Sequence, residues 1–135
     1  MGTVRMSDTL AHIRNCMAVH RRVARLRITS ANVSLARALN RAGYAPGFCI
    51  AHDLAPGGRQ RRWLRLELRR ADAAPAMRSL VSASRPGLRV QASAASLMPS
   101  VYCNGMAIIN TTKGILTGSL ARRLGIGGEV VCHVV

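Results

Sequence analysis

The side chains that could hold a metal stand singly along the chain. The four cysteines are Cys16, Cys49, Cys103 and Cys132, and no two of them have the C-x-x-C spacing. The four histidines form neither an H-E-x-x-H motif nor a pair beside a carboxylate. Tetrahedral zinc sites need such ligands in groups. We therefore expect no metal site and no cofactor.

The chain contains few residues that could act as general acids or bases. Only 5 residues are Asp or Glu, too few for paired carboxylates to be expected at one site. The G-x-S-x-G, P-loop and G-x-G-x-x-G motifs are all absent. The sequence thus predicts neither an enzyme nor a site for a small-molecule substrate.

The charge of the chain points to a polyanion as partner. Lys and Arg number 20 against 5 acids, a formal charge of +15, and Lys113 is the only lysine. Arginine presents a planar fork that grips phosphate oxygens and stacks on bases. We expect RNA ahead of DNA or a membrane surface. A GC-rich genome also favours Arg over Lys, but it does not explain why acids are so few.

The apolar content favours a folded protein over a basic tail. Hydrophobic residues make up 49% of the chain, yet no apolar run approaches the roughly 18 to 20 residues that cross a bilayer. A cationic membrane-active protein would need a long basic amphipathic helix, whereas the basic residues here are spread over expected strands and turns. We therefore expect no membrane partner.

The first half of the chain predicts a helix, a strand, a second helix and a β-hairpin. Ser7 and Ser30 are expected to cap the helices, and Gly43 to stop the second. The expected strand at 23–29 alternates and has one basic face. Leu64, Leu66 and Leu68 are expected on one face of the hairpin. The predicted ranges are a helix at 7–20, a helix from 30 to 43, and strands at 48–52 and 63–70 across a turn at 56–58.

The second half predicts mostly strands with short helices, after a linker at 71–76. Strands at 77–83 and 88–91 flank a sequence typical of a type II turn, and Gly125 stops a short helix at 117–124. A helical segment at 93–98, a buried strand at 106–110 and a terminal strand at 129–135 complete this half. The fold class is α+β, with two small α/β domains at residues 1–72 and 73–135.

Between the buried strand and the last helix lies a polar loop, residues 110–114. Asn110, Thr111 and Thr112 each donate and accept hydrogen bonds, Lys113 adds a cation, and Gly114 lets a backbone approach closely. Such groups reach ribose hydroxyls and base edges, which suits RNA. Taken alone, such a loop is more often a plain surface turn than an RNA contact.

An ordered set of motifs closely resembles the family of the eighth protein of the bacterial-type small ribosomal subunit. Arg14-Asn15 comes first, followed by S-R-P-G-L-R at 84–89, residues 105–117 with T-K-G-I-L-T, and A-R-R-L-G-I-G-G-E-V-V-C at 121–132. The match covers about residues 8–135. Asn110 and Thr112 stand where the family usually has Ser, and both still offer a hydrogen-bonding side chain.

The resemblance implies a two-domain structural protein that binds the central domain of the small-subunit rRNA and supports ribosome assembly and translation. Its partners would be that rRNA and neighbouring small-subunit proteins. Arg59, Arg61 and Arg62, on the expected hairpin, are predicted to meet phosphates or a neighbouring protein. The predicted RNA-binding residues are Arg14, Asn15, Ser30, Arg59, Arg61, Arg62, Arg85, Pro86, Gly87, Arg89, Asn110, Thr111, Thr112, Lys113, Gly114, Gly128 and Glu129.

The compartment and an alternative function are also predicted from the sequence. Bacterial members of the family carry more acids and lysines, so we expect a mitochondrial ribosome, with the bacterial cytoplasm or a plastid as alternatives. The Arg-rich first helix and strand could serve as an uncleaved targeting segment or simply bind RNA. The alternative function is that of a free-standing regulatory RNA-binding protein.

Overall fold

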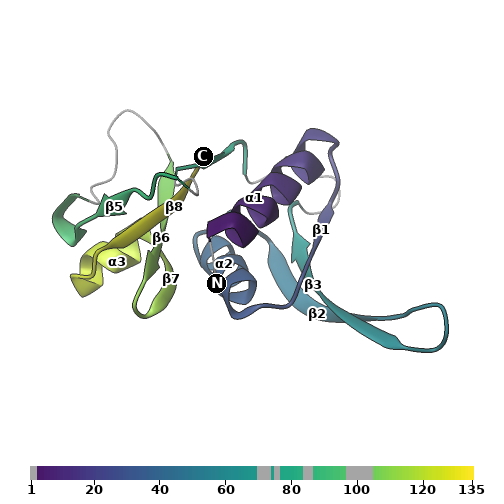
Figure 1. The fold of residues 1–135 in the computed structure, drawn as a ribbon. Coiled ribbons are helices and arrows are strands. Elements are labelled where there is room, and N and C mark those ends of the chain that lie inside the picture. The colour runs from purple at the N-terminus through teal and green to yellow at the C-terminus, as the bar shows by residue number, and fades with distance from the viewer. Residues whose placement is uncertain (1–2, 70–73, 75–76, 84–86, 97–104) are drawn as a thin grey trace.

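The computed structural model describes residues 3–69, 74, 77–83, 87–96 and 105–135, with the backbone alone for residues 3–5. These residues form three α-helices, a short 3-10 helix and eight strands in two antiparallel sheets (Figure 1), which confirms the predicted α+β class. The elements are α1 (Thr3–Ala18), β1 (Val23–Leu26), α2 (Ser30–Arg41), β2 (Gly47–Leu54), β3 (Gln60–Glu67), β4 (Leu80–Ser82), β5 (Gln91–Ala92), η1 (Ala94–Ser96), β6 (Met106–Thr111), β7 (Gly114–Thr117), α3 (Gly118–Leu124) and β8 (Gly128–Val134).

Helix α1 begins four residues earlier than the capping argument placed it. Ser7 lies inside the helix rather than at its cap, because the helical pattern continues back to Thr3 and Met6 already packs on the core. The helix stops near Ala18, where His20 takes a left-handed backbone with φ 58° and Arg21 N donates to Cys16 O at 2.9 Å. Leu10 and Ile13, three residues apart on one face of α1, are fully buried.

Helix α2 is capped by Thr29 and not by Ser30, so the predicted cap is wrong by one residue. Thr29 has an extended backbone, and its hydroxyl accepts a hydrogen bond from Asn32 N at 3.2 Å. Ser30 is therefore the first helical residue and is exposed. Gly43 follows the helix with φ +85°, the left-handed backbone expected of its stop signal.

The N-terminal sheet has the strand order β1-β3-β2. The predicted hairpin is confirmed, but β2 is longer than predicted and β3 lies three residues nearer the turn: β2 pairs with β3 from Gly47↔Glu67 to Leu54↔Gln60. Strand β1 ends at Leu26, three residues before the predicted end. Leu64, Leu66 and Leu68 are buried together as their alternation predicts.

The C-terminal sheet has the order β4-β8-β6-β7, and β5 pairs with another part of β8. The two strands predicted at 77–83 and 88–91 are shorter than expected. They do not pair with each other, because each pairs with a different part of β8, at Leu80↔Val134 and at Gln91↔Glu129. Their predicted type II turn includes residues 84–86, outside the described residues. The segment at 93–98 keeps a single 3-10 turn, η1. Helix α3 and strands β6 and β8 are confirmed, with Thr117 as the N-cap and Gly125 as the left-handed C-cap of α3.

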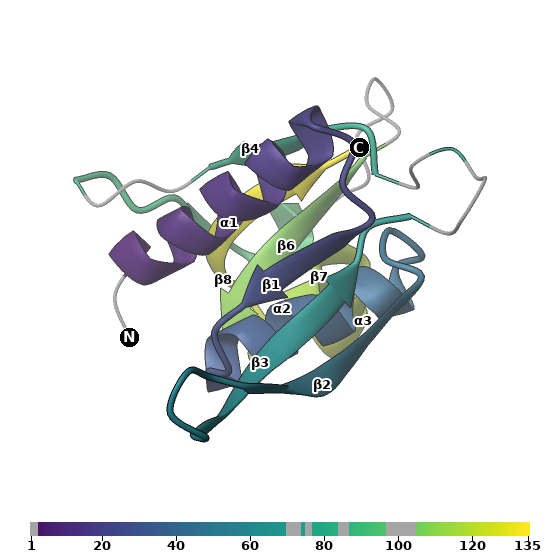
Figure 2. The same ribbon diagram turned by 90° about the vertical axis from the view of Figure 1, so that its right-hand side faces the viewer.

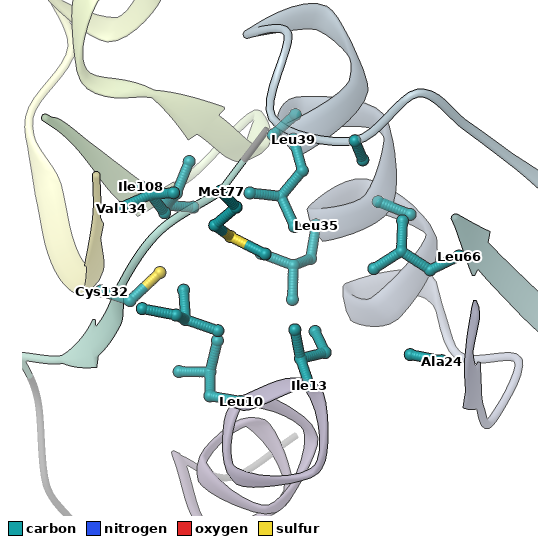
Figure 3. Packing of buried hydrophobic residues seen from close by; sticks show 14 of the residues in the cluster. Leu10, Ile13, Ala24, Leu35, Leu39, Leu66, Met77, Ile108, Cys132 and Val134 are labelled. Carbon is teal, nitrogen blue, oxygen red and sulfur yellow. The ribbon is translucent and has the colours of Figure 1, made fainter. Parts of the chain in front are cut away.

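One core joins the two sheets. Leu10 and Ile13 of α1 and Leu35 and Leu39 of α2 meet side chains of both sheets, as Figure 3 shows. Figure 1 shows α1 and α2 between the two sheets, and Figure 2 shows α1 lying along the strands. The sheets fall on either side of the predicted boundary between residues 72 and 73, while the domain division itself stays a prediction. This arrangement fixes the relative position of the segments that carry the polar residues.

Candidate nucleic-acid interface

The polar residues 110–114 form the tip of a β-hairpin rather than a loop. Strand β7, which the sequence patterns did not predict, pairs with β6 so that Thr111 lies opposite Gly114. Thr112 and Lys113 alone make the turn, and both are exposed. Gly114 has φ +102°, a backbone that L side chains rarely adopt, so glycine is required here. The tip is therefore held in one shape before any ligand binds.

The hydroxyl of Thr111 closes this hairpin. It donates to Gly114 O at 2.8 Å and accepts from Lys113 N at 3.2 Å. The proton of the hydroxyl is thus committed within the protein, and Thr111 can offer only acceptor capacity to a ligand. Thr112 carries a hydroxyl for which the described residues provide no partner. Thr112 is the better candidate for direct contact.

A groove of about 860 Å³ runs beside this hairpin, between the first turns of α1 and α2 and the C-terminal sheet. The predicted site residues that line it come from five separate segments of the chain: Ser30, Arg89, Asn110, Gly114 and Glu129. In Figure 1 the β6–β7 turn lies on the same side of the molecule as the start of α2, and a β-carbon on Gly114 would lie 3.8 Å from Ser34 Oγ. The fold thus brings together polar residues that are far apart in sequence.

The groove contains positioning and charged residues that were missing from the predicted site. Asn32 of α2 is buried and bonds to two other segments. Its side chain accepts a hydrogen bond from Thr9 Oγ1 at 3.1 Å and donates one to Arg27 O at 2.9 Å. Arg25 and Arg27 also line the groove. The basic face of the predicted strand pointed to the two arginines, whereas no local pattern marks Asn32. Asn32 fixes the first turn of α2 to α1 and to the end of β1.

Glu129 belongs to a row of hydrogen-bonding side chains across three strands. It lies opposite Asn110 on β6 and opposite Gln91 on β5. Two amides and a carboxylate in such a row can both donate to and accept from base edges. Gly128 is needed beside them, because a β-carbon there would overlap the carbonyl oxygen of Asn110. The predicted pair Gly128 and Glu129 therefore combines close packing with a polar contact.

Two predicted residues of α1 lie away from the groove lining. Arg14 is exposed, and its Nε donates to Leu80 O at 3.1 Å, which ties α1 to β4. Asn15 is exposed beside it. Gly87 is also exposed, while Arg85 and Pro86 lie outside the described residues. Arg14 has a structural contact, and its role and that of Asn15 toward RNA stay predictions.

The predicted arginines of the β2–β3 hairpin form a separate basic region. Arg59, Arg61 and Arg62 are exposed at or near its tip and do not line the groove. Nearby, Arg25 pairs with Asp53, and its guanidinium lies 4.3 Å from the centre of the Trp63 ring. Because Asp53 is paired with Arg25, this acid of β2 does not neutralise the tip arginines.

The described part of the chain lacks grouped metal ligands and long apolar helices. It contains no group of three or more His, Cys, Asp or Glu that could hold a metal ion. Burial raises the pKa of the Cys132 thiol to about 12, which disfavours the thiolate that a metal would need. No helix among these residues is long and apolar enough to cross a membrane.

The fold and the groove define a class: a small, basic α+β protein with a groove lined by polar side chains and three arginines. Comparison with known proteins gives the family. The model of the ribosomal protein S8 family matches residues 5–135, and the chain belongs to this family.

Similar proteins cover almost the whole chain. The small ribosomal subunit protein uS8c of Cyanidium caldarium is 33% identical over 132 residues, 96% of each chain. Protein uS8 of Pseudomonas entomophila is 34% identical over 130 residues, and that of Cellvibrio japonicus 35%, each match covering 96% of this chain and 95% of the relative. The chain is a constituent of the small ribosomal subunit, in a structural, non-enzymatic family whose general role is to bind rRNA.

Proposed function

We propose that the groove and the β6–β7 hairpin together hold an irregular helix in the central domain of the small-subunit rRNA, without any catalytic step. The observation that supports this is the convergence of Ser30, Arg89, Asn110, Gly114 and Glu129, five predicted residues from five segments, on one groove. Polar groups in a preformed groove can read ribose hydroxyls and base edges, while arginines at its rim meet phosphates.

The residues of the groove contact different parts of the RNA according to their chemical groups. Asn110 and Glu129, opposite each other on β6 and β8, contact base edges or sugars. Arg27 and Arg89 meet phosphates of the flanking strands, and Lys113 adds a cation at the hairpin tip. Gly114 keeps the backbone close to the RNA. Because the hairpin is already closed by Thr111, little conformational entropy is lost on binding.

We further propose that the ribosome concerned is mitochondrial and that neighbouring small-subunit proteins contact the exposed surfaces of this chain. The support for the compartment is compositional: 20 basic residues of which a single one is lysine, against 5 acids. An acid-poor chain of this kind resembles the Arg-rich, acid-poor segments that direct import into mitochondria.

Sedimentation of organelle lysates tests these proposals. Mitochondria and plastids are purified separately, and the chain is followed through a gradient by an antibody together with in vivo RNA crosslinking. We expect it in the mitochondrial small-subunit fraction, crosslinked to one region of the central rRNA domain. Recovery at the top of a gradient in which small subunits are intact, or crosslinks to messengers alone, would contradict the proposed function.

A further inference from the structure

Strand β2 is an edge strand of the N-terminal sheet, and α2 contacts it. In the order β1-β3-β2 its only strand partner among the described residues is β3. Figure 2 shows the outer side of β2 open along its length. An eight-residue strand is long enough to pair with a further strand.

The hydrogen bonds of the hairpin show which backbone groups face this open side. Ala55 N donates to Arg59 O at 2.8 Å, in register with the pair Asp53↔Arg61. In an antiparallel ladder, residues alternate between bonding inward and pointing outward. The amide and carbonyl groups of Phe48, Ile50, His52 and Leu54 therefore point away from β3. Four residues in a row offer main-chain donors and acceptors at alternate positions.

Two of these residues, Ile50 and Leu54, have apolar side chains that are exposed toward the hairpin tip. Ile50 is 50% exposed and Leu54 is 77% exposed, with His52 exposed between them. Figure 1 shows this part of the hairpin projecting away from α2. Natural edge strands commonly carry a charge, a proline or a bulge that prevents pairing. The outward positions of β2 have no such protection.

The charge beside this edge selects the partner. Arg59, Arg61 and Arg62 are exposed at or next to the tip, and the described residues give none of them an ion pair. The acid on β2, Asp53, is already paired with Arg25. RNA could meet the arginines but would not cover alternating apolar side chains or a row of amides, whereas an extended peptide satisfies both.

We propose that the open edge of β2 adds an extended, acidic segment of a neighbouring protein as a further strand of the N-terminal sheet. Its backbone pairs with Phe48 to Leu54, its alternate side chains cover Ile50 and Leu54, and its carboxylates meet the tip arginines. The partner is thus a protein strand with net negative charge.

Amide hydrogen exchange at single-residue resolution tests this pairing. It is measured on the free chain and on intact small subunits isolated from the source cells. We expect the amides of Ile50, His52 and Leu54 to slow by at least about tenfold on assembly, because each gains an acceptor. The amides of Ala51 and Asp53, already bonded to β3, should change far less. Unchanged exchange at Ile50 and His52, or equal slowing of all five, would overturn the proposal.

A matched pair of variants and a crosslink identify the partner. His52→Pro removes an outward donor without breaking a hairpin bond, and His52→Ala removes the imidazole but keeps the donor. A benzophenone side chain at position 54, in assembled subunits, should crosslink to an acidic protein segment. The yield of this crosslink should fall at least about tenfold in His52→Pro and stay unchanged in His52→Ala. Crosslinks to rRNA, to a second copy of this chain or to a basic segment overturn the proposal.

Both experiments separate this proposal from the proposed function. If the chain sediments with small subunits but its β2 amides show no alternating protection, the proposed strand addition is wrong and the proposed function still stands. Should His52→Pro fail to fold, the exchange pattern of the parent chain still decides the matter.

Discussion

The two hairpins of this protein differ in how they can meet a partner. The β2–β3 hairpin carries Arg59, Arg61 and Arg62 at an exposed tip away from the groove. The β6–β7 hairpin has a two-residue turn with a single cation, Lys113, and a hydroxyl that bonds across the turn. The first offers charge and an open strand edge, and the second offers a fixed shape with hydrogen-bonding groups.

This difference teaches where specificity should lie. Contacts to phosphates give affinity that depends on salt and hardly on sequence, whereas contacts to sugars and base edges need groups held in position. The β6–β7 hairpin is held by pairing, by Thr111 and by the packing of Gly128 against Asn110. We therefore expect RNA discrimination from the β6–β7 hairpin and only general attraction from the β2–β3 hairpin.

The largest expected effect comes from disturbing the support of the β6–β7 hairpin. Gly128→Ala places a methyl group against the carbonyl oxygen of Asn110, so β6 and β8 must separate locally. We expect the free energy of unfolding to fall by about 2 kcal/mol and rRNA affinity to fall with it. Gly87→Ala is the control for stability, since no atom of the described residues lies within 4 Å of a β-carbon at that position. Equal melting temperatures of the two variants would show that the strands yield without cost.

Thr111→Val tests whether the hairpin is preformed. Valine keeps the shape of the side chain but removes the hydroxyl that bonds to Gly114 O and Lys113 N. We expect a loss of about 1 to 2 kcal/mol in the free energy of unfolding, measured by urea denaturation. In the matched control Thr112→Val the change should stay within about 0.5 kcal/mol, because Thr112 is exposed. A stability of Thr111→Val equal to that of the control would mean that the turn forms without this hydroxyl.

Replacing Arg59, Arg61 and Arg62 together by Ala tests the other hairpin. We expect affinity for the cognate rRNA fragment and for an unrelated duplex to fall by a similar factor, about tenfold at low salt, with a flatter salt dependence. Replacing all three by Lys keeps the charge and should retain the salt slope. A loss confined to the cognate RNA would show that this hairpin reads sequence or shape.

Local patterns predicted the elements better than the site. The alternation of Leu64, Leu66 and Leu68 and the glycine stop at Gly125 act over a few residues, and both are confirmed. Strand β7 was missed because it has only four residues and follows a Thr-Lys turn without the usual Asn-Gly signal. The cap of α2 was misplaced by one residue because Thr29 and Ser30 are adjacent and both residue types can cap, and Ser7 was misplaced because α1 continues back to Thr3.

The groove itself could not be predicted from short patterns. It depends on long-range packing of α1 and α2 against the C-terminal sheet through the shared core. Asn32 looks like any polar residue on a helix, and only the fold shows it buried and bonded to Thr9 and Arg27. The resemblance to a family supplied Ser30, Arg89 and Glu129 as candidates, and the fold explains why residues so far apart line one groove.

The most direct test of the division between the hairpins is a set of salt titrations with the cognate rRNA fragment and a scrambled duplex. The proteins compared are the parent chain, Thr112→Val and Lys113→Ala, all checked for equal melting temperature. We predict that Thr112→Val lowers the ratio of cognate to scrambled affinity by about fivefold or more and leaves the salt slope unchanged, because a hydrogen bond is lost without a charge. Lys113→Ala should keep that ratio and reduce the slope by about 1. An unchanged affinity ratio for Thr112→Val, or a changed ratio for Lys113→Ala, would contradict the assignment of RNA discrimination to the hydrogen-bonding groups of the β6–β7 hairpin.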